Sequence, residues 1–236
     1  MIALVRKILQ VFERHKLWDE GVELIGSWCF HLYQRHLGVK PYPLKTQDID
    51  FLLPYPYRGH IHIDLIQELE ALGFRHDFRP DGSIYLWNAE LRIEFMIPER
   101  GRGMEKAPPI RALGLRATPL RFVELLLQHP ISVIEGGVKV VLPDPAAFCL
   151  HKLLIANRRQ RPESRLKDFE QALHVVPVIK PATIRRIYPK LPKTWRQGVL
   201  QSLERAAHDV PLLKDNAARL AETLQRIEHH PRARGR

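Results

Sequence analysis

Two short stretches in the first quarter of the chain decide its fold: LIGSW at residues 24–28 and QDIDFLL at residues 47–53. The second stretch is short, apolar and bounded by polar residues and a proline, which predicts a β-strand. Because side chains alternate across a strand, Asp48 and Asp50 lie on one face and the apolar residues on the other. Two like charges that close repel each other unless a cation lies between them. A hard divalent cation such as magnesium, which prefers carboxylate oxygens, meets that requirement.

The first stretch predicts a strand over residues 22–25, followed by a helix over residues 27–37. Gly26 and Ser27 therefore lie where a strand passes into a helix. The free backbone N–H groups and the dipole of a helix start favour a phosphate group there. We therefore expect an anionic ligand beside the two carboxylates.

Together, Gly26-Ser27 and the later Asp48-x-Asp50 resemble the motif of the polymerase-beta-like nucleotidyltransferases. That family carries a third metal carboxylate on a later strand of the same sheet, and the matching stretch is LRIEFMI at residues 91–97. Its alternation leaves Glu94 on the polar face, although the family residue is usually aspartate.

This resemblance implies a role for each of these residues. Asp48 and Asp50 would hold two divalent ions, Mg²⁺ or Mn²⁺, and Glu94 would join one of them. Gly26 and Ser27 would contact the terminal phosphate of a nucleoside triphosphate such as ATP. The alternative is that the carboxylates line a solvated sheet face and that Gly26 only makes a tight turn.

A second resemblance lies in the helical half, where Lys152 is followed by Lys167 and Asp168. This spacing is similar to that of uncharacterised bacterial nucleotidyltransferases and of the nucleotidyltransferase toxins of toxin–antitoxin and phage-defence systems. The resemblance implies that Lys152 binds the triphosphate, that Lys167 and Asp168 orient it, and that a protein antitoxin could be a partner. The alternatives are a Lys152 stem lying over its helix and an Asp168 ion pair with Arg165 or Lys167 within one helix.

The net charge of +11 is unevenly distributed along the 236 residues. Residues 1–110 hold 14 basic and 15 acidic residues, whereas residues 111–236 hold 23 basic and 11 acidic residues. A basic half beside an acidic site suits an enzyme that joins a nucleotide to a polyanion such as RNA. We expect RNA contacts from the basic cluster Arg158, Arg159 and Arg161, the alternative being that these arginines only solubilise helix faces.

Composition also indicates the compartment. Cys29 and Cys149 lie in apolar helical contexts, which favours free thiols in a reducing environment. The amino terminus lacks a long apolar region and a cleavage site, and no stretch approaches the length of a membrane span. The expected location is the cytoplasm, with no membrane partner.

The pattern of elements predicts an α+β protein, with a mixed-sheet nucleotidyltransferase core followed by a helical C-terminal domain. We expect the core over residues 1–110, a mainly helical basic domain with a small hairpin over residues 111–230, and a basic tail over residues 231–236. Within the core, residues 61–72 are expected to form a helix.

Three functions are compatible with these features. The first is a metal-dependent nucleotidyltransferase that moves a nucleoside monophosphate from a triphosphate to a hydroxyl, which could belong to RNA or tRNA. The second is an inactive nucleotidyltransferase-like protein that binds RNA. The third is an enzyme that modifies a small molecule such as an antibiotic.

Overall fold

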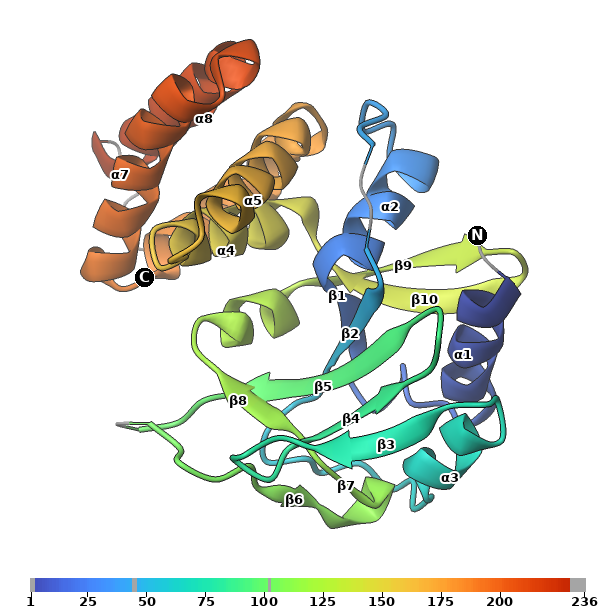
Figure 1. The fold of residues 1–236 in the computed structure, drawn as a ribbon. Helices are drawn as coiled ribbons and strands as arrows, with labels where there is room; N and C mark the ends of the chain where they lie inside the picture. Colours follow the sequence, from blue (N-terminus) through green and yellow to red (C-terminus); the bar gives the residue numbers. More distant parts are fainter. Residues whose placement is uncertain (1–2, 44–45, 102, 230–236) are drawn as a thin grey trace, which may run out of the picture. The chain divides into compact units, whose positions relative to one another are not determined.

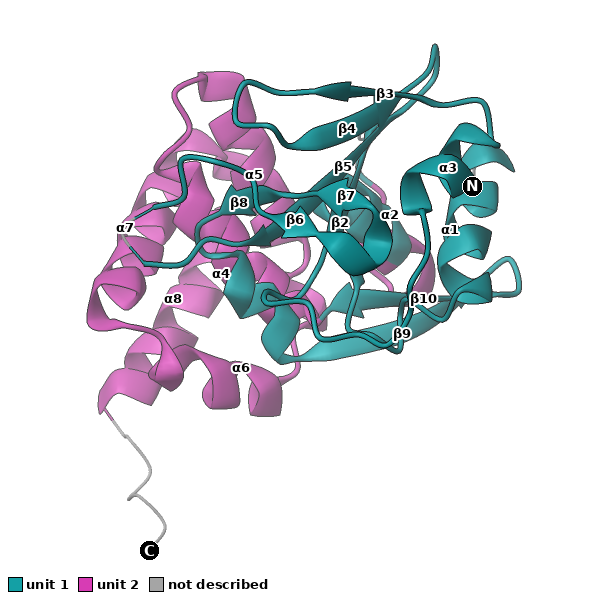
Figure 2. Cartoon of the chain, turned by 90° about the horizontal axis from the view of Figure 1, so that it is seen from below, with its two compact units in different colours: residues 1–32, 42–143 teal, residues 33–41, 144–236 magenta. Residues whose placement is uncertain are grey.

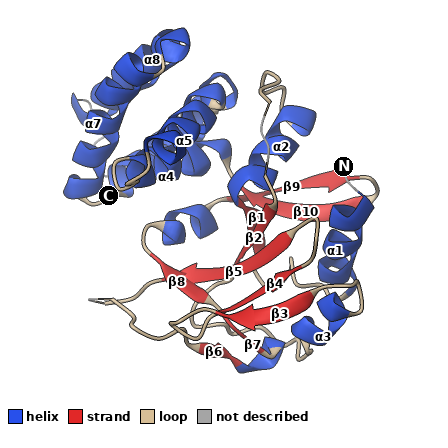
Figure 3. Cartoon of the chain, in the orientation of Figure 1, coloured by secondary structure: helices blue, strands red, loops and turns tan. Residues whose placement is uncertain are grey.

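The computed structural model describes residues 3–43, 46–101 and 103–229, so the expected basic tail lies outside the described residues. The chain divides into two compact units, unit 1 with residues 1–32 and 42–143 and unit 2 with residues 33–41 and 144–236 (Figure 2). Within the described residues, all strands belong to unit 1 and unit 2 is helical (Figure 3).

A mixed sheet forms the centre of unit 1 (Figure 1). Strands β2 and β5 pair in parallel, as do β5 and β8, whereas the other neighbours are antiparallel. The mixed sheet and the helical C-terminal region confirm the expected α+β class. The strand order is β1 (Glu23–Ile25), β2 (Asp48–Leu52), β5 (Arg92–Pro98), β4 (Ile84–Trp87) and β3 (Arg75–Phe78), with β8 (Thr118–Leu120) beside β5.

One face of this sheet holds the core of unit 1. Phe51 and Phe95 alternate with polar residues along β2 and β5, and both are fully buried. Helix α1 (Ala3–Arg14) covers this face, and the ring of Phe12 stacks on Phe51 with centroids 3.9 Å apart. Because apolar side chains occupy one face, Asp48, Asp50 and Glu94 are left on the other.

Helix α2 (Gly26–His36) follows β1, as expected. Helix α3 is shorter than expected, because it covers only Leu65–Glu70. The amide N–H of Ile63 donates to the carbonyl of Ala112, and Asp64 accepts from the N–H of Gln67 as the helix N-cap. The prediction of a helix from residue 61 is therefore wrong, because a long-range backbone bond holds the residues before Asp64 outside the helix.

The division between the units differs from the expected boundary after residue 110. The segment after residue 110 stays in unit 1 because β8 completes the mixed sheet and because β10 packs against β1 and α1. The small hairpin expected after residue 110 is present as β9 (Pro130–Glu135) and β10 (Val138–Pro143), with Gly136 and Gly137 at its turn. Not expected from the sequence were the small ladder β6 (Pro109–Ile110) with β7 (Leu115–Arg116) and the 3₁₀ segments η1 (Arg111–Leu113) and η2 (Val123–Gln128).

Unit 2 begins its run of helices at Asp144, whose Oδ1 accepts the N–H of Ala146 at 2.8 Å. Pro145 at the first helical position lacks the N–H that would otherwise be unsatisfied there. No helix of the described residues is both long and apolar enough to cross a membrane. The helices are α4 (Pro145–Ala156), α5 (Pro162–His174), α6 (Pro181–Ile187), α7 (Lys193–Asp209) and α8 (Lys214–His229), with 3₁₀ segments η3 (Val176–Val178), η4 (Tyr188–Lys190) and η5 (Pro211–Leu213).

Candidate active site

The carboxylates of β2 lie on the sheet face opposite α1. Asp48 is exposed and Asp50 is half-buried, whereas Ile49 and Phe51 between and after them are fully buried. The alternation of the strand therefore places both carboxylates as the sequence predicts.

Gly26 meets Asp50 at the start of helix α2. Gly26 has a φ of +69°, in the left-handed region that favours glycine. A Cβ placed on Gly26 would collide with Oδ2 of Asp50 and would lie 3.2 Å from its Cγ. This position therefore requires glycine for two reasons: its backbone angle favours glycine, and a larger residue would not leave room for the carboxylate. Ser27 is buried in the first turn of the same helix.

Glu94 lies directly beside Asp50. The parallel register of β2 and β5 pairs Asp50 with Glu94 and Asp48 with Arg92. Register partners in neighbouring strands share a face, so Glu94 is on the carboxylate face one strand away. The expected position of Glu94 is thus confirmed, whereas its role as a metal ligand stays a prediction.

An arginine neutralises Glu94 in this structure. A guanidinium N–H of Arg79, in the turn between β3 and β4, donates to Oε1 of Glu94, and Arg92 lies 3.8 Å from the same oxygen. Arg79 is itself held at 3.0 Å by the hydroxyl of Thr118. The third carboxylate therefore already has a cationic partner.

This arrangement bears on the expected metal. Among the described residues, no group of three or more histidine, cysteine or acidic side chains is placed to hold a metal ion. Asp48 and Asp50 keep the right donor chemistry for Mg²⁺ or Mn²⁺ on one face of β2. Glu94 would join them with a carboxylate whose Oε1 already pairs with Arg79.

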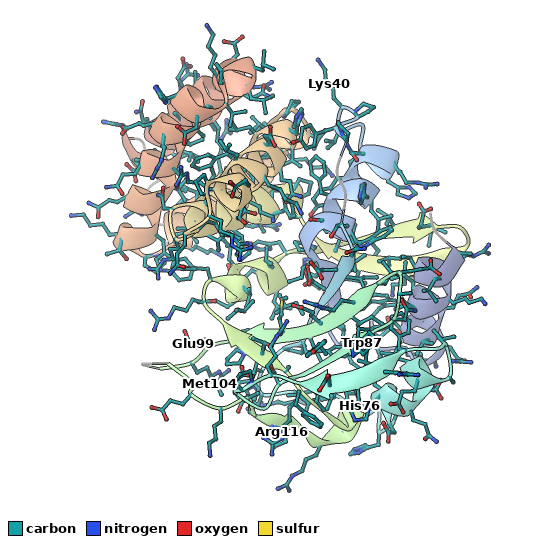
Figure 4. All side chains as sticks on the ribbon, in the orientation of Figure 1. Lys40, His76, Trp87, Glu99, Met104 and Arg116 are labelled. Carbon is teal, nitrogen blue, oxygen red and sulfur yellow. The ribbon has the colours of Figure 1, made fainter. Side chains whose placement is uncertain are left out.

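Two aromatic residues on the same face were missed by the sequence analysis. The register places Tyr85 beside Glu94 and Trp87 beside Arg92. Trp87, which is labelled in Figure 4, is 39% exposed. The guanidinium of Arg92 lies 5.3 Å from the centroid of the Tyr85 ring. The i, i+2 spacing of the two rings could have shown that they share a face, but only the register shows that it is the carboxylate face.

Next to the carboxylates, the face is apolar. Ile25 is the register partner of Asp50 on its other side, and with Leu52 it packs against Val123 and Leu126 of η2. Asp50 therefore lies between an apolar cluster and Glu94, which accounts for its partial burial.

The second set of predicted residues lies in unit 2. Nζ of Lys152 donates to Oδ1 of Asp168 at 2.8 Å, and Nε of Arg159 donates to Oδ2 at 2.7 Å. The side chains of Lys152 and Asp168 are only 8% and 3% exposed. Burial by itself raises the pKa of Asp168, but the two cations outweigh it and hold that pKa below its usual value.

These contacts rule out one alternative for Lys152 and give Arg159 an ion-pair partner, whereas the binding roles of both stay predictions. Lys152 is buried in an ion pair, so its stem does not lie over an exposed helix surface. Asp168 bridges α4 and the turn that follows it, and Arg165 instead lies 3.6 Å from Asp209. Arg158 and Arg161 are exposed and Lys167 is half-buried, whereas Arg159 is committed to Asp168.

A buried glutamate near the carboxylates makes stability depend on pH. Glu23 on β1 is 1% exposed, and its Oε2 has no hydrogen-bond partner within the described structure. Burial raises the pKa of Glu23 from 4.5 to about 8. Between these values the unfolded chain releases a proton that the folded chain retains, so stability falls as the pH rises through this window.

We therefore expect Glu23→Gln to be more stable than the wild type at pH 7, by on the order of 3 kcal/mol. The free energy of unfolding in urea should decline between pH 5 and pH 8 in the wild type and much less in the variant. Glu13→Gln on the exposed side of α1 is the matched control and should keep the wild-type slope. Equal slopes in the wild type and Glu23→Gln would contradict this assignment.

Comparison with known proteins identifies the family of the chain. The family described as Nucleotidyltransferase matches residues 3–186. This range includes the β2 carboxylates, Glu94, Lys152 and Asp168. The chain belongs to this nucleotidyltransferase family. No curated protein matches the sequence.

Solved structures give a similar result. The crystal structure of an antigenic nucleotidyltransferase-like protein from Paracoccidioides brasiliensis is 15% identical, covers 90% of this chain and 93% of its own, and has a TM-score of 0.50. The solution structure of the antibiotic-resistance factor ANT(2'')-Ia is 14% identical over 96% of both chains, with a TM-score of 0.39. A crystal structure of ANT(2")-Ia with adenylyl-2"-tobramycin is 14% identical over 83% of this chain and 94% of its own, with a TM-score of 0.43. At 15% identity the likeness to the first of these structures concerns the fold alone.

Proposed function

We propose that this nucleotidyltransferase moves a nucleoside monophosphate from a nucleoside triphosphate to a hydroxyl, in a reaction that depends on Mg²⁺ or Mn²⁺. The observation that carries the proposal is the packing of the Asp50 carboxylate against Gly26 at the start of α2, with Glu94 beside it. A glycine that admits a carboxylate to a helix start brings an acidic group and a phosphate seat to the same place.

Each side chain has a proposed task. Asp48 and Asp50 would hold the divalent ion, which lowers the pKa of the attacking hydroxyl and stabilises the leaving pyrophosphate. Gly26 and Ser27 would orient the terminal phosphate. Arg79 keeps Glu94 neutralised until the site is filled, and Glu94 would then turn toward Asp50.

The resemblance also implies roles for residues of unit 2. Lys152 carries a positive charge held by Asp168, and such a fixed cation suits a triphosphate. Lys167 would help to orient it. We propose RNA as the acceptor because the positive surplus lies wholly in residues 111–236 and because Arg158 and Arg161 are exposed. The proposal of a protein antitoxin as a partner rests on the sequence resemblance alone.

A transfer assay tests the proposal. The protein is incubated with Mg²⁺ or Mn²⁺, each α-labelled nucleoside triphosphate in turn, and either total RNA or a mixture of hydroxyl-bearing antibiotics. We expect label in RNA that disappears with a chelator. Label in the antibiotic fraction would show that the acceptor is a small molecule and not RNA. RNA binding without any transfer would favour an inactive RNA-binding protein.

A further inference from the structure

A large groove opens on the surface of unit 2. It has a volume of about 970 Å³ and lies between α6 with η4 on one side and one face of α8 on the other. Segments η3 and η4 both pack against α8, so the groove belongs entirely to unit 2. It contains neither Lys152 nor Asp168, and the proposed function makes no use of it.

The groove has an apolar floor. Ile184 and Leu220 are buried at its base, and Ile179 and Ile227 are half-buried along it. Leu220 and Ile227 are seven residues apart on α8 and so lie on the same helix face. The exposed parts of Ile179 and Ile227 would gain from being covered by apolar side chains.

The rim of the groove is positively charged. Five basic side chains line it and all are exposed, with none of the described lining residues acidic. Arg226 is 3.4 Å from Glu222, an exposed pair of little energetic weight. The five are Arg185, Arg186 and Lys190 on one side and Arg219 and Arg226 on the other.

This charge disfavours two occupants made of the same chain. Residues 231–236 carry three arginines and no acidic residue, so the rim repels the chain's own C-terminal end. A second copy of a chain with a net charge of +11 is also disfavoured. The occupant must bring negative charge.

The floor decides between a polyanion and a protein. A phosphate backbone could pair with the basic rim, but it has no apolar side chains to cover Ile179 and Ile227. Single-stranded nucleic acids also use aromatic side chains for base stacking, and the described lining residues include none. An amphipathic helix with an apolar stripe and acidic flanks satisfies both the floor and the rim.

We infer that this groove docks an acidic amphipathic helix of a partner protein. The apolar stripe of the partner covers Ile179 and Ile227, and its carboxylates pair with Arg219 and Arg226 on one side and with Arg185 on the other. The interaction is independent of the carboxylate site in unit 1, so it holds whether or not the chain transfers nucleotides.

A designed peptide tests this inference on the full-length protein. The probe is a fluorescent helix of about 14 residues, with leucines at i, i+4 and i+7 and glutamates on both flanks. Fluorescence anisotropy should show saturable binding, and amide chemical shifts should change in α6 and α8. A scrambled peptide of the same composition should bind at least about tenfold more weakly, because it lacks the apolar stripe.

Matched variants locate the binding. The double substitution Arg219→Glu with Arg226→Glu should weaken binding of the peptide by about tenfold or more, because like charges then face each other. Lys193→Glu with Lys214→Glu makes the same change of net charge on exposed residues outside the groove and should alter binding by less than about twofold. Ile227→Ser should weaken binding without changing net charge.

Four results would overturn the inference. They are no saturable peptide binding, equal binding of the scrambled peptide, equal loss in the Lys193 and Lys214 control, and displacement of the peptide by a single-stranded RNA that binds more tightly through Arg219 and Arg226. The last result would assign the groove to nucleic acid. Circular dichroism should show that each variant keeps its helical content.

Discussion

Replacing Asp50 with asparagine is expected to reduce nucleotide transfer by at least about 100-fold while the protein remains folded. The side chain keeps its size, so the packing against Gly26 is preserved, but the charge that would hold a divalent ion is lost. Asp48→Asn should have an effect of the same order, because the two carboxylates share one face of β2. The initial rate with saturating triphosphate and Mg²⁺ measures both effects.

Asp77→Asn is the matched control for this experiment. Asp77 lies on β3 opposite Tyr85, in the same sheet as Asp50 but not adjacent to it. Asp77→Asn therefore makes the same chemical change away from the proposed site. It should keep near wild-type turnover, and thermal unfolding of all three variants should stay close to that of the wild type. Wild-type turnover in both Asp48→Asn and Asp50→Asn, or full activity in the presence of a chelator, would show that the reaction is carried elsewhere.

The second large effect concerns stability. Asp168→Ala should destabilise the protein by about 3–5 kcal/mol, because it leaves the buried ammonium of Lys152 without its partner. Arg159 is 45% exposed in its pair with Asp168, so it can return to solvent at little cost. Urea denaturation followed by circular dichroism, which reports the helices of unit 2, measures the change.

A double substitution separates charge burial from substrate binding. Lys152→Met with Asp168→Leu removes both buried charges and should be more stable than Asp168→Ala by at least about 2 kcal/mol. If Lys152 also binds the triphosphate, the double variant should fold well but should bind nucleotide more weakly than the wild type. A double variant as unstable as the sum of its single variants would show that the pair is not coupled as the structure indicates.

Some of the candidate site is predictable from the sequence because it follows from local geometry. Side chains alternate along a strand, so the apolar residues at 49, 51, 93 and 95 place Asp48, Asp50 and Glu94 on the polar side. Asp144 followed by proline begins a helix for equally local reasons. Residue types at fixed spacing are enough for statements of this kind.

Other features depend on contacts between residues far apart in sequence. The parallel register that sets Glu94 beside Asp50, the Arg79 partner of Glu94 and the aromatic neighbours Tyr85 and Trp87 are decided by strand pairing. Likewise, a backbone bond from Ile63 to Ala112 shortens α3 although its residues have helical spacing. Strand register and pairing depend on the packing of the whole unit, so no single stretch of sequence is enough to predict them.

The sequence by itself therefore determined the class of fold, the family motif and the sheet face on which the carboxylates lie. Tertiary structure decided which groups meet: the Asp50 carboxylate packs against Gly26, Glu94 pairs with Arg79, and Lys152 pairs with Asp168. The physical reason is that side-chain direction has a short period along the chain, whereas a buried charge is stable only beside a partner that folding brings to it.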